Sequence, residues 1–138
     1  MKIFISGSRK ITSLSAYTET VLKKIIERDI DEILVGDCDG IDYLVQKFFK
    51  KNGYTKVLVY VSGDGHARRN AGFNEKHIPV DPNIPFASRE FYAVKDIAMS
   101  NDCNVGIAIW DGKSRGTSQN IERLHKLNKC VQTILNKN

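Results

Sequence analysis

The 138-residue sequence has few cysteines, and they form no pattern that would bind a metal or build a disulfide framework. Cys38, Cys103 and Cys130 are odd in number and widely separated, and none belongs to a CxxC pair or a His/Cys cluster. They are therefore expected to be reduced thiols, which favours a cytoplasmic location. Neither a metal ion nor another cofactor is expected.

Long apolar runs are also missing. The first apolar run, residues 3–5, is followed at once by Ser6 and Gly7. Such a run is too short for the core of a signal peptide and far too short to span a bilayer. The sequence predicts no membrane partner, and this run is expected to be a first buried strand.

Acidic residues are fewer than basic ones, at 16 Asp and Glu against 21 Lys and Arg, and the net charge is +5. This excess favours anionic ligands and permits weak, nonspecific attraction to nucleic acid. Part of it falls on the predicted solvent faces of helices, as at Lys23, Lys24 and Lys47. Net charge alone therefore does not predict nucleic-acid binding.

Short apolar segments alternate along the chain with segments of helical periodicity. Residues 2–5, 32–35, 56–60, 105–110 and 130–135 are predicted as strands, and residues 17–26, 41–49, 89–100 and 117–127 as helices. Continuous apolar strands between amphipathic helices are typical of a parallel sheet that is covered on both faces. We expect one α/β domain over residues 1–138, a Rossmann-like three-layer sandwich with about five mainly parallel strands.

Residues 61–88 interrupt this alternation. The segment contains Gly63, Gly65, Gly72, Pro79, Pro82 and Pro85 and has little periodicity. Loops of this length are usually functional or disordered. Its basic residues could form a lid over an anion, and a mobile excursion or a subunit contact explains the segment equally well; these residues are His66, Arg68, Arg69, Lys76 and His77.

Three polar, glycine-containing loops follow predicted strands, at residues 6–9, 36–42 and 110–117. In an open parallel sheet, ligands bind outside the carboxyl ends of the strands, so these loops are expected to meet at one edge. Glycine allows close approach of the backbone, and the amides at a helix N-terminus favour a phosphate. The three loops together therefore predict a phosphate-binding site.

The loops are expected to contribute different chemistry. Ser114, Gly116 and Thr117 stand where a helix is predicted to begin, and Ser8 with Arg9 could add a hydroxyl and a charged contact. The loop from Gly36 is acidic, and its Asp37 and Asp42 suit sugar hydroxyls, a base amine or a cation, whereas Asp39 is expected to cap the following helix. Trp110 could stack on a base or pack at the rim of the site.

Four segments in this order resemble the SLOG superfamily of Rossmann-like nucleotide-binding proteins: FISGSRK, GDCDGID, KDIAM and VGIAIWDGKSRGTSQNI. That superfamily includes the Lonely Guy phosphoribohydrolases and the DNA-processing protein A fold. The small, stand-alone members related to the YspA family look most similar. The resemblance extends over nearly the whole chain except residues 61–88.

The resemblance implies that the first loop and the Gly-Thr loop hold a phosphorylated ribosyl ligand. By position, Gly7, Ser8 and Arg9 match the first loop, and Gly112, Gly116 and Thr117 match the second. The hydrolases carry an Arg-Lys-x-x-Met stretch, which residues 95–99 match only in part, and a catalytic Glu where this chain has Asn120. Asn cannot act as a base, so the hydrolase mechanism does not transfer intact.

Three functions compete on this evidence. The first is binding or sensing of a nucleotide-like small molecule, with the ligand residues Gly7, Ser8, Arg9, Gly36, Arg89, Lys95, Trp110, Gly112, Ser114, Gly116, Thr117 and Asn120. The second is an N-glycosidase or phosphoribohydrolase-like enzyme, with a catalytic carboxylate among Asp37, Asp42, Asp96 and Asp111. The third is binding of single-stranded nucleic acid, which is disfavoured because no groove of interleaved basic and aromatic residues is evident. Self-association to a homo-oligomer through Phe86, Phe91 and Tyr92 also stays open.

Overall fold

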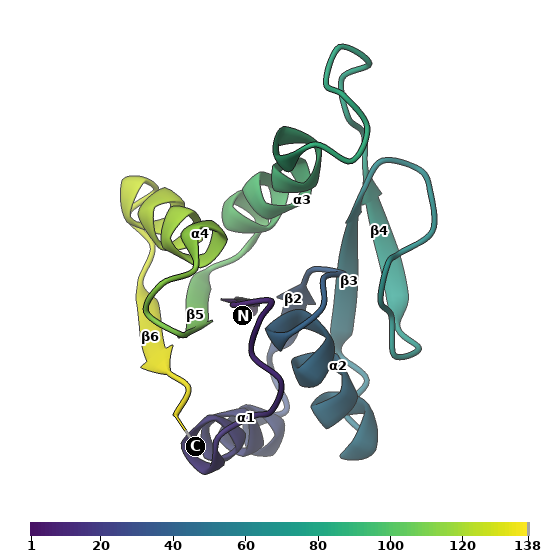
Figure 1. Ribbon diagram of the computed structural model, residues 1–138. Helices are drawn as coiled ribbons and strands as arrows, with labels where there is room; N and C mark the ends of the chain where they lie inside the picture. Colours follow the sequence, from purple (N-terminus) through teal and green to yellow (C-terminus); the bar gives the residue numbers. More distant parts are fainter. Residues whose placement is uncertain (138) are drawn as a thin grey trace.

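A computed structural model describes residues 1–137 and contains a six-stranded sheet in the order β4-β3-β2-β1-β5-β6 (Figure 1). All five neighbouring pairs are parallel. The strands are β1 (Lys2–Gly7), β2 (Glu32–Val35), β3 (Val57–Ser62), β4 (Asn74–Ile78), β5 (Val105–Trp110) and β6 (Val131–Leu135). The helices are α1 (Ala16–Arg28), α2 (Ile41–Lys51), α3 (Arg89–Asp102) and α4 (Arg115–Lys126).

Helices cover both faces of the sheet, which confirms the predicted sandwich (Figure 1). Successive side chains of a strand point to opposite faces, so Ile3 and Ile5 of β1 join one core and Phe4 joins another. The first core includes Leu22 of α1 and the second Met99 of α3. Burial on both sides explains why the central strands are continuous apolar runs.

The sheet has six strands where about five were expected, because β4 lies inside the segment predicted to be irregular. It is an edge strand that pairs with β3, with Val59 opposite Glu75. Four of its five residues, Asn74 to His77, are exposed. A strand that buries almost nothing carries no apolar pattern in the sequence, and the connection from β3, residues 63–73, contains no helix.

The start of α2 also differs from the expectation. Asp39 does not cap this helix: the cap residue is Gly40, with φ of 77°, and the Asp39 carboxylate accepts a hydrogen bond from Arg69 instead. A Cβ at Gly40 would overlap the backbone of Arg9 in the loop after β1. Glycine is therefore required here both for the positive φ and for the close approach of two loops.

Two further features concern the cysteines and the length of the helices. Among residues 1–137, Cys38, Cys103 and Cys130 are all free thiols. None of the described helices combines the length and the apolar character that crossing a membrane requires.

The order of the strands determines where a ligand site can form. The chain builds outward from β1 through β2 and β3 to β4, and then returns to place β5 on the other side of β1. The direction of winding therefore reverses between β1 and β5. In open α/β sheets, the crevice at the carboxyl ends of two such strands is the usual ligand site.

Candidate functional site

A cavity of about 610 Å³ opens at the carboxyl ends of β1 and β5, between the loops after these strands and the helices α3 and α4. Most of the candidate site residues meet there. Those lining the cavity are Gly7, Ser8, Arg9, Asp42, Arg89, Lys95, Asp96, Asp111, Ser114, Gly116, Thr117 and Asn120. Their roles toward a ligand stay predictions, but the structure brings them to one place.

Four candidates do not line the cavity. Asp37 is buried behind it, and Gly36 packs against the Asp42 carboxylate so closely that a Cβ would overlap it. Trp110 is half-buried, and its indole Nε1 donates to the carbonyl oxygen of Ser114 at 3.0 Å. Gly112 provides a positive φ of 81° in the same turn. Trp110 and Gly112 therefore shape the turn before α4.

The loop after β1 is held tightly against β5. A Cβ at Gly7 would overlap the carbonyl oxygen of Ile109 and the side chain of Ile41. The next residue, Ser8, is buried, its amide donates to Ile109, and its hydroxyl accepts from the amide of Asp111 at 3.2 Å. Glycine at position 7 thus lets the two loops join at the floor of the cavity.

The loop after β5 presents the N-terminus of α4 to the cavity. Asp111 Oδ1 accepts from the amides of Lys113 and Ser114, both at 2.8 Å, and these bonds lower the pKa of the exposed Asp111 carboxyl. Ser114 is the cap residue, but its side chain makes no capping hydrogen bond to the helix. The first-turn amides of α4 therefore have no side-chain cap, and such groups attract anions.

Most of the basic side chains that line the cavity have no acidic partner among residues 1–137. The cavity is lined by seven basic and three acidic residues. Five of the basic ones are exposed and form no ion pair with any of residues 1–137; these are Arg9, Lys10, Arg89, Lys113 and Arg115. These five residues, which we call the basic wall, suit the cavity to an anionic group.

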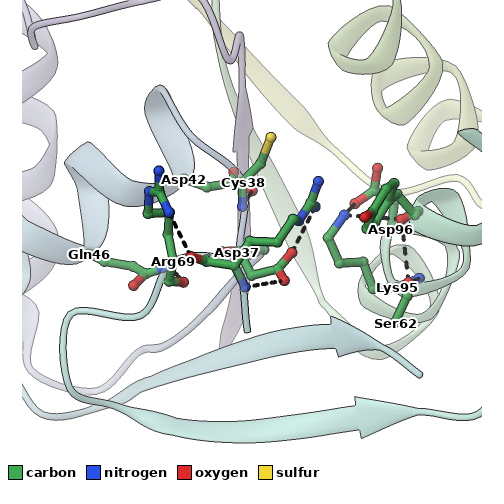
Figure 2. A network of polar contacts seen from close by, with 11 residues as sticks. Asp37, Cys38, Asp42, Gln46, Ser62, Arg69, Lys95 and Asp96 are labelled. Carbon is green, nitrogen blue, oxygen red and sulfur yellow. Dashed lines mark hydrogen bonds and ion pairs between the residues drawn. The ribbon is translucent and has the colours of Figure 1, made fainter. Parts of the chain in front are cut away.

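Other charges at the cavity are already paired with one another, and we call this group, Asp37 with Arg68 and Lys95 with Asp96, the paired wall (Figure 2). Asp37, with 3% of its side chain exposed, accepts from the Arg68 guanidinium at 2.8 Å and from the Arg68 amide at 3.0 Å. Burial raises the pKa of the Asp37 carboxyl, but the bonds and charge of Arg68 outweigh burial and leave this pKa below its usual value. Asp37 is thus ionised and satisfied at neutral pH.

The second pair on this wall belongs to α3. Lys95 is buried, and its Nζ donates to Asp96 Oδ1 at 3.2 Å and to the carbonyl oxygen of Tyr92 at 3.0 Å (Figure 2). Burial lowers the pKa of Lys95. The negative charges of Asp96, Asp42 and Asp37 outweigh burial, so this pKa lies above its usual value. Lys95 is therefore a permanent cation.

Asp42 differs from the other carboxyl groups of the cavity. Burial raises its pKa to about 7, against the attraction of Lys95 and with a smaller contribution from the repulsion of Asp96. Its Oδ2 accepts a hydrogen bond from the amide of Cys38 at 3.2 Å. A carboxyl group that is half-protonated near neutral pH can donate or accept a proton, which is the property of a general acid or base.

Several lining residues were not identified as site residues from the sequence. Arg68 was assigned to a lid and Tyr92 to an apolar contact, yet both line the cavity, as do Lys10, Lys113, Arg115 and Gln119. The spacing of Arg89, Tyr92 and Asp96 along α3 was an available signal, because residues three or four apart share a helix face. The position of Arg68 had no comparable signal.

The predicted lid is partly fastened to the fold. Gln46 is fully buried in α2, and its side chain donates to the carbonyl oxygens of Gly36 and Arg69 and accepts from the amide of Ala71. These bonds tie residues 69–71 to α2. Among residues 1–137, no group of three or more His, Cys, Asp or Glu side chains is arranged to hold a metal ion.

A search of solved structures finds a chain with a similar fold. The fold is similar to that of DNA processing protein A from Helicobacter pylori. The TM-score is 0.65 at 16% sequence identity, and the match covers 99% of this chain but 66% of the other, so this chain spans less than two thirds of that protein. The study of that protein describes a single-stranded DNA binding mode for it. Identity this low shows the fold alone.

Comparisons of the sequence itself give no further assignment. No protein-family model matches the chain, and no curated protein matches it. The resemblance to the DNA-processing protein A fold is confirmed by the structural comparison alone. Membership of the SLOG superfamily stays an inference from the four sequence segments.

Proposed function

We propose that the cavity binds a nucleotide or a similar phosphorylated nucleotide derivative. The observation that carries this proposal is the basic wall, because its five basic side chains without acidic partners line the same cavity as the uncapped N-terminus of α4. A phosphate group carries negative charge and acceptor oxygens, which match the positive charges and N–H donors of the basic wall. The resemblance to the SLOG superfamily supports the same ligand class.

The shape and lining of the cavity support a ligand larger than phosphate. Its volume of about 610 Å³ lies within the usual range for small-molecule sites. Its lining combines buried apolar residues, Phe4 and Met99, with the polar residues Thr117 and Asn120 of α4. A phosphate on the basic wall would leave the sugar and base to extend toward the paired wall.

A binding screen tests this proposal directly. The purified protein is mixed with nucleosides, nucleoside mono- and diphosphates, ribose 5-phosphate and inorganic phosphate, and thermal stability is measured together with mass spectrometry of the ligand. Nucleoside phosphates should raise the melting temperature, because a ligand at one hundred times its Kd stabilises by about 2.7 kcal/mol. The proposal is wrong if nucleosides stabilise as well as their phosphates do, or if none of the phosphorylated compounds stabilises.

The same screen separates binding from catalysis. Ligand recovered intact would support a binding or sensing domain. Release of free base would instead establish hydrolysis of the N-glycosidic bond, with Asp42 as the acid that protonates the departing base, since it is the carboxyl group with a pKa near 7. Asn120 stands where the related hydrolases have their Glu, which favours binding without turnover.

The fold similarity favours single-stranded nucleic acid as a second candidate ligand. The basic wall would then contact the phosphates of a strand rather than one nucleotide. The test is the affinity for a short oligonucleotide at several salt concentrations. Strand binding requires the logarithm of the affinity to fall by roughly 0.7 per phosphate contact for each tenfold rise in salt. A salt-independent affinity, or an affinity no greater than that of a mononucleotide, would exclude this candidate.

A further inference from the structure

Arg68 and Tyr92 form a stacked pair on the cavity wall. The guanidinium carbon of Arg68 lies 3.8 Å from the centre of the Tyr92 ring, and both side chains line the cavity. They come from distant parts of the chain, the β3–β4 connection and α3. At this distance the guanidinium lies in cation–π contact with the aromatic face, a contact that Arg makes readily.

The stacked pair is held in place without a ligand. Asp37 binds both the side chain and the backbone amide of Arg68, and this carboxylate lies behind the cavity wall, where 3% of it is exposed. Gln46 fixes the following residues through Arg69 and Ala71. On the other side, Phe91 packs edge-on against Tyr92 at 5.3 Å. The orientation of the guanidinium plane is therefore set by the protein.

The charge of Arg68 is already matched, which distinguishes it from the basic wall. Arg9 and Arg89 have no acidic partner, whereas Arg68 has Asp37 at 2.8 Å. One third of the Arg68 side chain, 33%, is nevertheless exposed. Arg68 can therefore contact a ligand without bringing an uncompensated charge to it.

We propose that the Arg68–Tyr92 pair is the stacking platform for the nucleobase of the bound ligand. Guanidinium planes stack on bases in nucleic-acid complexes, and a preoriented platform loses little conformational entropy on binding. This inference rests on the proposed function and adds the base subsite to it. The phosphate would lie on the basic wall and the base on the Arg68–Tyr92 platform, with the ribose between them.

The test compares two ligands that differ only in the base. Isothermal titration calorimetry measures Kd for adenosine 5′-monophosphate and for ribose 5-phosphate. Wild-type protein should prefer the nucleotide by about tenfold or more, the effect of stacking one base. Arg68→Lys keeps the charge but removes the plane, and should reduce this preference to about threefold or less. Tyr92→Leu, which removes the support from the other side, should have the same effect.

The controls identify a failure at each level. Arg69→Lys is the matched control, because Arg69 is the neighbouring residue, pairs with the exposed Asp39 and does not line the cavity. It should leave both Kd values unchanged. The platform is excluded if Arg68→Lys weakens both ligands equally, or if neither variant reduces the preference. If wild-type protein binds neither ligand, the proposed function fails and the platform with it, whereas equal binding of both ligands excludes the platform alone.

Discussion

The two walls of the cavity balance their charges in different ways. The basic wall presents exposed side chains such as Arg9 and Arg115 without acidic partners, while the paired wall joins Arg68 to Asp37 and Lys95 to Asp96. Exposed charges are solvated and cost little when unpaired, whereas buried charges need partners. The difference indicates that one wall is available to an anion and that the other is a rigid support.

Removing one basic residue from each wall, in two separate variants, should lower the free energy of unfolding by very different amounts. Lys95→Met leaves the Asp96 and Asp42 carboxyl groups without their buried cation, so we expect a loss of about 3 kcal/mol in the free energy of unfolding. Lys113→Met on the basic wall should change it by less than about 0.5 kcal/mol. Urea denaturation of both variants measures the two values. Equal losses would remove the distinction between the walls.

The paired wall should also make stability depend on pH through Asp42. Its pKa is raised to about 7 in the folded state, so the folded protein binds this proton more tightly than the unfolded chain does. Stability from this group is therefore present at low pH and is lost as pH rises through 7. The groups facing Asp42 are Lys95, Asp96 and Asp37.

Asp42→Asn isolates this contribution. Between pH 5 and pH 8, wild-type protein should lose about 2.5 kcal/mol of unfolding free energy relative to the variant, with most of the loss below pH 7. Urea denaturation of both proteins at each pH measures the difference, and titrations common to both cancel. A difference that does not vary with pH would mean that Asp42 is ionised throughout this range.

In contrast to stability, ligand affinity should depend strongly on the basic wall. Arg9→Ala removes a charged contact from the basic wall and should weaken adenosine 5′-monophosphate by about 1.5 kcal/mol, roughly tenfold in Kd, with little change in stability. Thr117→Val should act in the same direction. Lys51→Ala, at the end of α2, is the control for general electrostatic attraction. If the control weakens binding as much as Arg9→Ala, the effect is one of net charge and not of this site.

The sequence predicted part of each wall as site residues, Arg9 and Arg89 of the basic wall and Asp37, Lys95 and Asp96 of the paired wall, but not Lys10, Lys113, Arg115 or Arg68. The loops after β1 and β5 were easy to place because both strands are clear apolar runs, and parallel strands bring their carboxyl ends to one edge of the sheet. These loops contribute Ser8, Arg9, Ser114 and Thr117. The pairing of Arg68 with Asp37 depends on a connection without helical or strand periodicity. A contact made by an irregular segment leaves no pattern to read.

The edge strand and the helix caps show the same limit. β4 was missed because its exposed residues NEKHI bury almost nothing, so the segment has no apolar signal. Asp39 has the residue type of a cap, but Gly40 takes that place because the backbone of Arg9 leaves no space for a Cβ. Tertiary contacts outweighed local preference at both positions.

The N-terminal caps of α3 and α4 differ, and this difference should produce the smallest of the expected effects on stability. Ser88 Oγ accepts from the amide of Phe91 at 3.1 Å at the start of α3, whereas Ser114 makes no such bond at the start of α4. Ser88→Ala should therefore cost about 1 kcal/mol of stability and Ser114→Ala only a few tenths. Adding adenosine 5′-monophosphate should stabilise the Ser88 variant as much as the wild type, because the amides of α4 are untouched. If Ser114→Ala proves as costly as Ser88→Ala without ligand, the start of α4 is already capped and its amides are not free for a phosphate.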